Sequence, residues 1–184
     1  MKKKLMLLFV LLALWNVKGI AQDVKGPAKG KAVVYITRVS HAGALFNFRL
    51  FHNDQYVGKF NARKYIRIEC EPGKHLFWAK GENRHFLPAE LEADKTYFIE
   101  ARPRIGAIQT HVYLRPIRQE DQRLIGKIDA LIAQQDAEAF EIDYLQDMNQ
   151  KLDHFIEASL LKYEKSLQPK KVYPTLNAKE FYTK

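Results

Sequence analysis

The chain has 184 residues, of which 30 are Lys or Arg and 21 are Asp or Glu, so its formal net charge is +9. Nucleic-acid binding needs a concentrated patch of Lys and Arg rather than a mild excess, so we expect no nucleic-acid partner. Cys70 is the single cysteine, which excludes a disulfide within the chain.

The first 21 residues have the three parts of a secretory signal peptide. A basic start at residues 1–4 precedes an unbroken apolar run at 5–15 and the small residues Gly19 and Ala21. A spanning helix needs about 20 apolar residues, so this run is too short for one. We predict cleavage before Gln22 and a soluble, exported mature protein. Removing these residues takes away four lysines and no acid, which lowers the charge from +9 to +5.

The clearest structural signal lies at residues 65–79. Apolar and polar side chains alternate on both sides of Pro72 and Gly73, which is typical of strands because successive side chains point to opposite faces. Pro72 fits the second position of a tight turn, and Gly73 can supply the positive φ that follows it. We therefore predict a central β-hairpin.

Further strands are indicated by β-branched and aromatic residues between turn signals. They are expected at residues 31–38, 44–52, 56–60, 86–91, 96–102 and 108–114. Pro88 cannot donate a ladder hydrogen bond, so its strand should lie at a sheet edge or a bulge. The predicted fold is mainly β: an antiparallel β-sandwich of about seven or eight short strands at 31–116, after a flexible lead-in at 22–30.

After Pro116 the apolar spacing becomes helical. One stripe runs from Leu124 to Ile132, and a second predicts a helix at 144–166 capped by Asp143. The second stripe contains Leu145, Met148, Leu152, Phe155, Ile156 and Leu160. At 1.5 Å per residue this helix would be roughly 34 Å long, which exceeds a strand of about 17 to 20 Å. The stripe could pack in a helical hairpin that covers the sheet, or it could bind a partner or a second copy of the chain. Residues 117–168 form this helical extension, and 169–184 are expected to be a mobile tail.

Several polar residues share the outward phase of their strands and form the candidate binding face. They are Arg49, Arg67, Glu100, Arg102, His111, Tyr113 and Arg115. If their strands are neighbours, this face could bind an anionic glycan or the acidic surface of a protein, and otherwise it is a solvated sheet face.

Other chemistry is sparse. An aromatic platform for sugar stacking could form from Tyr65, Phe77 and Tyr113. The alternative is that these aromatic residues are buried in the core between two sheets. Cys70 is in phase with buried isoleucines, so we expect an inert thiol. The six histidines show no metal-ligand spacing, so we expect neither a metal site nor a cofactor.

A family resemblance is carried by turn chemistry and strand pattern. The matching segments are Ala32-Val33-Val34-Tyr35-Ile36, Asp54-Gln55-Tyr56-Val57-Gly58, Glu71-Pro72-Gly73-Lys74-His75 and residues 91–99. Residues 31–116 resemble the uncharacterised small β-domains of exported bacterial proteins and are similar in pattern to transthyretin-like and PEGA-type sandwiches. The resemblance implies a fold and no catalytic residues. The leader, ending in Ile-Ala-Gln, resembles exported proteins of Bacteroidota-type bacteria, which implies the periplasm or the cell surface of a Gram-negative cell, or the medium outside it.

We therefore expect an exported, non-catalytic interaction module that binds an envelope or extracellular protein or self-associates through its helices. The alternatives are a carbohydrate- or anionic-glycan-binding module and, third, an enzyme of unrecognised type.

Overall fold

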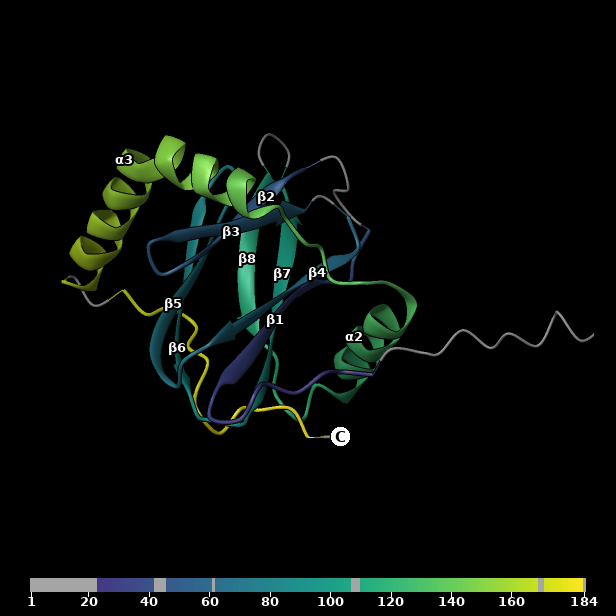
Figure 1. The fold of residues 1–184 in the computed structure, drawn as a ribbon. Coiled ribbons are helices and arrows are strands. Elements are labelled where there is room, and N and C mark those ends of the chain that lie inside the picture. The colour runs from purple at the N-terminus through teal and green to yellow at the C-terminus, as the bar shows by residue number, and fades with distance from the viewer. Residues whose placement is uncertain (1–22, 42–45, 61, 107–109, 169–170, 184) are drawn as a thin grey trace, which may run out of the picture.

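The computed structural model describes residues 23–41, 46–60, 62–106, 110–168 and 171–183. Over these ranges the chain forms eight strands followed by two helices, α2 and α3. The strands make two four-stranded sheets, and Figure 1 shows them stacked with a helix outside each. This confirms the predicted β-sandwich with carboxy-terminal helices. The predicted signal peptide at 1–21 lies outside the described residues.

The first sheet has the strand order β4-β1-β7-β8. Its strands are β4 (Lys64–Cys70), β1 (Ala32–Arg38), β7 (Thr96–Ile105) and β8 (Thr110–Pro116). β1 and β7 run parallel, whereas the β1–β4 and β7–β8 pairs are antiparallel. Every residue of β1 is buried, which follows from its near-continuous apolar sequence and its place between two strands.

The second sheet is wholly antiparallel, with the order β3-β2-β5-β6. Its strands are β3 (Gln55–Phe60), β2 (Phe48–His52), β5 (Gly73–Lys80) and β6 (Arg84–Leu91). Pro88 therefore stands in an edge strand, as its missing N–H requires.

The predicted central hairpin is wrong. β4 pairs with β1 in the first sheet, whereas β5 pairs with β2 and β6 in the second. Pro72 and Gly73 do turn the chain, and Gly73 has the expected positive φ of 123°, but the turn carries it from one sheet to the other. The physical reason lies in β5, whose Phe77 and Trp78 are both 0 % exposed although they point to opposite faces. Such a strand needs a partner on each edge and a layer on each face.

The main core fills the space between the two sheets. Ile66, Cys70 and Phe77 point into it, as the alternation predicts, together with Phe48, Leu50, Ile99, Val112 and Leu114. Tyr65, which was expected on the exposed side of its strand, is also buried, because a helix covers the outer face there.

α2 (Gln122–Gln134) covers the outer face of the first sheet. Its stripe of Ile125, Ile128, Leu131 and Ile132 packs against Val33, Tyr35, Tyr65 and Phe98. The helix thus buries the second face of β1, and this burial explains why that strand lacks polar alternation.

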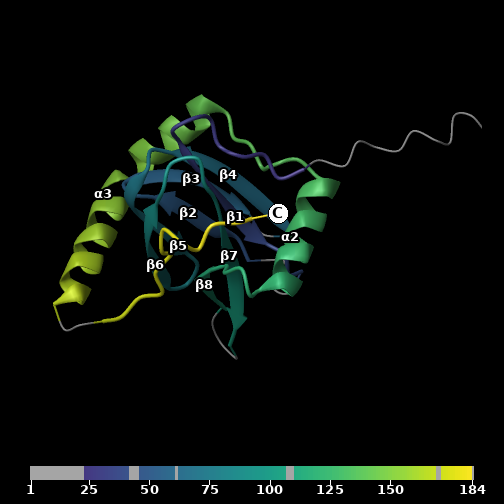
Figure 2. The same ribbon diagram turned by 90° about the horizontal axis from the view of Figure 1, so that it is seen from below.

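α3 (Ile142–Leu167) covers the outer face of the second sheet. Figures 1 and 2 show it on the opposite side of the sandwich from α2, so the two helices do not close a hairpin on each other. The predicted Asp143 cap is also wrong: Asp143 lies in the first turn, and Glu141 holds the cap position without a side-chain hydrogen bond. No helix in the described ranges is long and apolar enough to cross a membrane.

The expected mobile tail instead packs on the sandwich. Leu176 pairs with the edge strand β6, accepting a bond from the Glu90 N–H at 2.9 Å and donating to the Pro88 carbonyl at 2.9 Å. Further on, the Tyr182 N–H donates to the Thr96 carbonyl at 2.7 Å. Residues 171–183 therefore run from the second sheet to the first and cover the edge of β6.

Candidate functional site

Five residues of the candidate face lie together on the outer side of β7 and β8. The register pairs Glu100 with Arg115, Arg102 with Tyr113, and Arg104 with His111. Because successive side chains of a strand point to opposite faces, the side chains of these residues share one face. We call Glu100, Arg102, Arg104, His111, Tyr113 and Arg115 the β7–β8 surface. Arg104 was not among the predicted residues, because the strand was expected to end at residue 102, whereas β7 continues through Pro103 to Ile105.

One end of this surface is a partly buried ion-pair network. Arg115 Nη2 lies 2.9 Å from Asp121 Oδ1, and Arg115 Nε lies 3.7 Å from Glu100 Oε2. Asp121 is held at the start of α2, where its carbonyl accepts the Leu124 N–H. Glu100 is only 6 % exposed, and burial raises the pKa of its carboxyl although Arg102 and Arg115 oppose the shift.

A pocket of about 740 Å³ opens beside this network, between β7, β8 and the first turns of α2. Its lining residues are Val39, Ser40, Glu100, Arg102, Pro103, Arg115, Glu120, Asp121, Arg123, Leu124 and Lys127. Within the described chain, Arg102, Arg123 and Lys127 form no salt bridge. Arg123 and Lys127 come from α2 and Asp121 from the position just before it, and only the packing of that helix on the first sheet brings them here.

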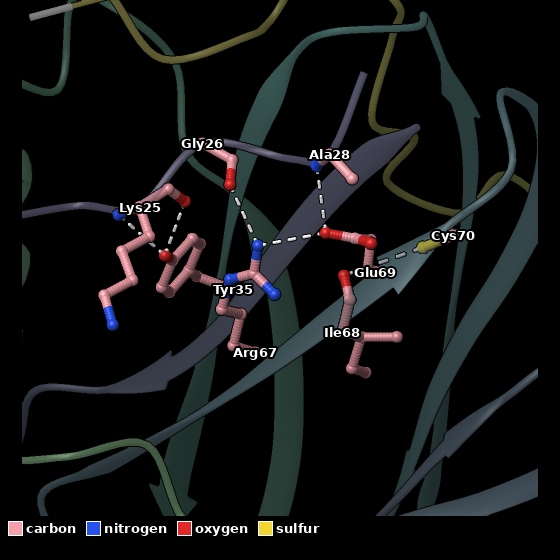
Figure 3. A network of polar contacts seen from close by, with 8 residues as sticks. All are labelled: Lys25, Gly26, Ala28, Tyr35, Arg67, Ile68, Glu69 and Cys70. Atoms are coloured by element: carbon pink, nitrogen blue, oxygen red, sulfur yellow. Dashed lines mark hydrogen bonds and ion pairs between the residues drawn. The ribbon is translucent and has the colours of Figure 1, made fainter. Parts of the chain in front are cut away.

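Arg67 belongs to a separate arrangement that fixes the lead-in. Its Nη2 donates to the Gly26 carbonyl at 2.9 Å and lies 3.1 Å from Glu69 Oε2, which also accepts the Ala28 N–H at 3.1 Å (Figure 3). The Tyr35 hydroxyl donates to the Lys25 carbonyl at 2.7 Å. Residues 25–28 are thus pinned to β1 and β4 rather than flexible, and Arg67 has a structural role.

Arg49 lies on the other sheet. It stands on the outer side of β2, paired with Lys59 of β3 and Lys80 of β5. The predicted face therefore divides into the β7–β8 surface, the Arg67 network and Arg49.

The candidate interaction stripe of α3 faces the second sheet. All six residues, Leu145, Met148, Leu152, Phe155, Ile156 and Leu160, pack in one cluster with Phe51, Tyr56, Trp78 and Phe86 of the second sheet. Ile156 is buried and the other five are half-buried, so most of the stripe's apolar surface is used in packing on the sheet.

The aromatic platform does not form, because Tyr65 is 3 % and Phe77 0 % exposed and only Tyr113, at 41 %, reaches solvent. The Cys70 thiol is buried beside Glu69 and Glu71, and burial together with these two carboxylates raises its pKa to about 11. In the described part of the chain no three His, Cys, Asp or Glu side chains form a metal-binding group.

The architecture defines the class of protein: a two-sheet β-sandwich with one helix outside each sheet. No family model matches the chain. A search of curated proteins finds similarity to an uncharacterized protein of Haemophilus influenzae, 23% identical over 115 residues, which are 61% of this chain and 68% of that protein. The resemblance to transthyretin-like and PEGA-type domains stays a prediction.

Proposed function

We propose that this protein is an exported, non-catalytic interaction module that binds another envelope protein through the β7–β8 surface and its adjoining pocket. Export rests on the leader-like pattern of residues 1–21. The observation that carries the binding site is the set of cations around the pocket, Arg102, Arg123 and Lys127, which make no salt bridge with the described residues.

The exposed residues around these cations fit a protein partner. Tyr113, which pairs with Arg102 across β7 and β8, is 41 % exposed, so an aromatic ring stands beside this basic group. Tyr and Arg are enriched at the centres of protein interfaces, because both combine a large contact area with hydrogen-bond donors. A partner that presents Asp or Glu beside an apolar contact would complement this surface in charge and in shape.

A catalytic use of Glu100 is less well supported. A general acid must reach the atom that it protonates, and the Glu100 carboxyl is almost fully buried beside Arg115. Its position fits a group that orients Arg115 and, through Arg115, the start of α2.

The proposal is tested by photo-cross-linking in the native host. A photoreactive residue replaces Tyr113, and the matched control carries it at Lys151, which lies on the exposed side of α3. We expect one envelope protein to be captured from position 113 and not from 151. This capture should be lost when Arg102→Glu and Lys127→Glu are added. Equal capture from both positions, or capture of the chain alone, would overturn the proposal.

A further inference from the structure

A row of basic side chains crosses the outer face of the second sheet. The strand register pairs Lys59 of β3 with Arg49 of β2, Arg49 with Lys80 of β5, and Lys80 with Arg84 of β6. Each of the four strands thus contributes one cation at the same level. At a strand spacing of about 4.8 Å, the row extends over about 14 Å. We call these four residues the cation row.

A β-bulge places Lys59 in the row. Lys59 and Tyr56 are three residues apart and would point to opposite faces of a regular strand. The register shifts between Leu50 and Phe51, leaving one extra residue on β3, so that Tyr56 pairs with Phe51 and Lys59 with Arg49. Both side chains therefore lie on the outer face.

The cation row is not neutralised within the described chain, where none of its four members forms a salt bridge. Lys80 donates to two neutral acceptors, the carbonyls of Gly81 and Glu82. The guanidinium of Arg84 lies 4.8 Å from the centre of the Phe155 ring, and its buried Nε has no hydrogen-bond partner among the described residues.

The members of the row lie close enough to repel one another at Lys80. Burial lowers the pKa of its ammonium group, and the charges of Arg84 and Arg49 lower it further, although the Glu82 carboxylate opposes the shift. Like charges in adjacent strand positions destabilise a sheet, so this arrangement carries a cost that an anionic ligand would relieve.

The geometry beside the row selects a linear ligand. α3 lies outside the second sheet (Figure 1) and crosses it in the same direction as the row, because Tyr144 contacts Tyr56 of β3 and Tyr163 contacts Phe86 of β6. With its side chains a helix is about 10 Å thick, so a flat membrane surface would rest on α3 before reaching the cations. A single polymer chain could lie alongside the helix.

The burial of the aromatic residues beside the cation row favours a polysaccharide over a nucleic acid as the ligand. Single-stranded nucleic-acid sites combine cations with aromatic faces on which bases stack. Here Tyr56, Phe51, Trp78 and Phe86 are at most 3 % exposed beneath α3. We propose that the cation row binds a linear anionic polysaccharide, whose repeated carboxylate or sulfate groups pair with successive strands. This site lies on the opposite sheet from the β7–β8 surface and does not depend on the function proposed there.

The test uses residues 22–184 and immobilised heparin as the linear polyanion, with dissociation constants measured over a series of NaCl concentrations. The variant is Arg49→Gln with Lys59→Gln, since both side chains are exposed and their loss leaves the core of the sandwich intact. The matched control, Lys29→Gln with Lys179→Gln, removes the same charge from exposed positions outside the second sheet.

We expect the Arg49 and Lys59 double variant to bind at least about tenfold more weakly, with a plot of log affinity against log salt that is shallower by about 1 to 2. The control should bind as the wild type does. Equal weakening in the control would show that net charge alone is responsible and would overturn the site. Absence of wild-type binding would also overturn it. So would single-stranded DNA that binds at least as tightly as heparin and depends equally on Arg49 and Lys59.

Discussion

Gly58 of β3 lies against Phe140, in the segment that precedes α3. Replacing Gly58 by alanine tests this close approach. Its φ is +140°, a backbone conformation that side chains rarely adopt. A Cβ at this position would meet Phe140 Cε2 at 2.3 Å and Ile66 Cδ1 at 3.0 Å. The Phe140 ring, which also stacks on Tyr144 at 5.8 Å, occupies the volume that a methyl group would need.

Two costs add for Gly58→Ala. The strained backbone costs of order 1–3 kcal/mol, and the forced displacement of a packed ring costs about 1–3 kcal/mol more. We therefore expect a loss of about 2–6 kcal/mol in the free energy of unfolding. Phe140→Ala alone should cost about 2 kcal/mol, since the ring is only half-buried. In the double variant the new methyl group enters the vacated space, so the two losses should fall short of additivity by about 1–3 kcal/mol.

Urea unfolding followed by tryptophan fluorescence measures these values, because Trp78 is fully buried and stacks on Phe51 at 3.7 Å. Gly73→Ala is the matched control: Gly73 has a φ of +123°, but no described atom lies within 4 Å of the position that the added methyl group would take. It should show the backbone cost alone and no coupling to Phe140→Ala. Equal losses for Gly58→Ala and Gly73→Ala, or strict additivity with Phe140→Ala, would refute the steric argument.

Three further outcomes are expected. Burial, helped by the neighbouring His75, lowers the pKa of His52 from 6.5 to about 4. The folded state therefore disfavours the protonated ring, and stability that is complete above pH 6.5 is lost as the pH falls towards 4, by at most about 3 kcal/mol. In urea titrations His52→Gln should reduce this loss, whereas His154→Gln, at an exposed position of α3, should not. Cys70 should resist a thiol reagent at about pH 8 and react fully in roughly 8 M urea, where the chain is unfolded; rapid reaction in the native state would contradict its burial. Deleting residues 119–184 should abolish the cooperative unfolding transition, because both outer faces lose their cover; a sharp transition in the truncated chain would show that the sandwich is independent.

Strand positions could be predicted because period-two alternation and turn residues are local signals. The alternation around Ile66 and the positive φ of Gly73 are both found in the structure. The partner of each strand could not be predicted in the same way. A Pro-Gly turn has the same sequence whether it joins neighbours in one sheet or carries the chain to another, and only the burial of both faces of β5 decides between them.

The helices show the same limit at the level of packing. Their apolar stripes were visible in the sequence, but a stripe does not specify which surface it covers. The two stripes of α2 and α3 contact different sheets, and each meets an aromatic set supplied by its own sheet. The buried outward residues Tyr65 and Trp78 signal that covering layer, since an exposed strand face would not hold two large aromatic rings.

The candidate site was partly predictable for a related reason. The β7–β8 surface follows from alternation in two strands that are neighbours in sequence and in the sheet. The cation row does not follow, because Lys59 reaches its face only through the bulge at β3 and Arg84 only through its register with Lys80. The α2 residues of the pocket depend on helix docking, which no local pattern specifies.

The edges of the sheets limit how a partner can bind. The Asn149 side chain accepts the Tyr56 N–H at 2.6 Å and donates to the Tyr56 carbonyl at 3.2 Å, so it caps β3 as a neighbouring strand would. Asn83 does the same for Val112 of β8, at 2.7 and 2.9 Å.

The two remaining edges are also occupied at a backbone group. Glu138 donates its N–H to the Tyr65 carbonyl of β4 at 2.8 Å, and Leu176 pairs with β6. Partners that add a strand need a row of free backbone groups, and these contacts interrupt each edge. We therefore expect a partner of this sandwich to contact side chains rather than to add a strand, which is consistent with the proposed sites at the β7–β8 surface and the cation row.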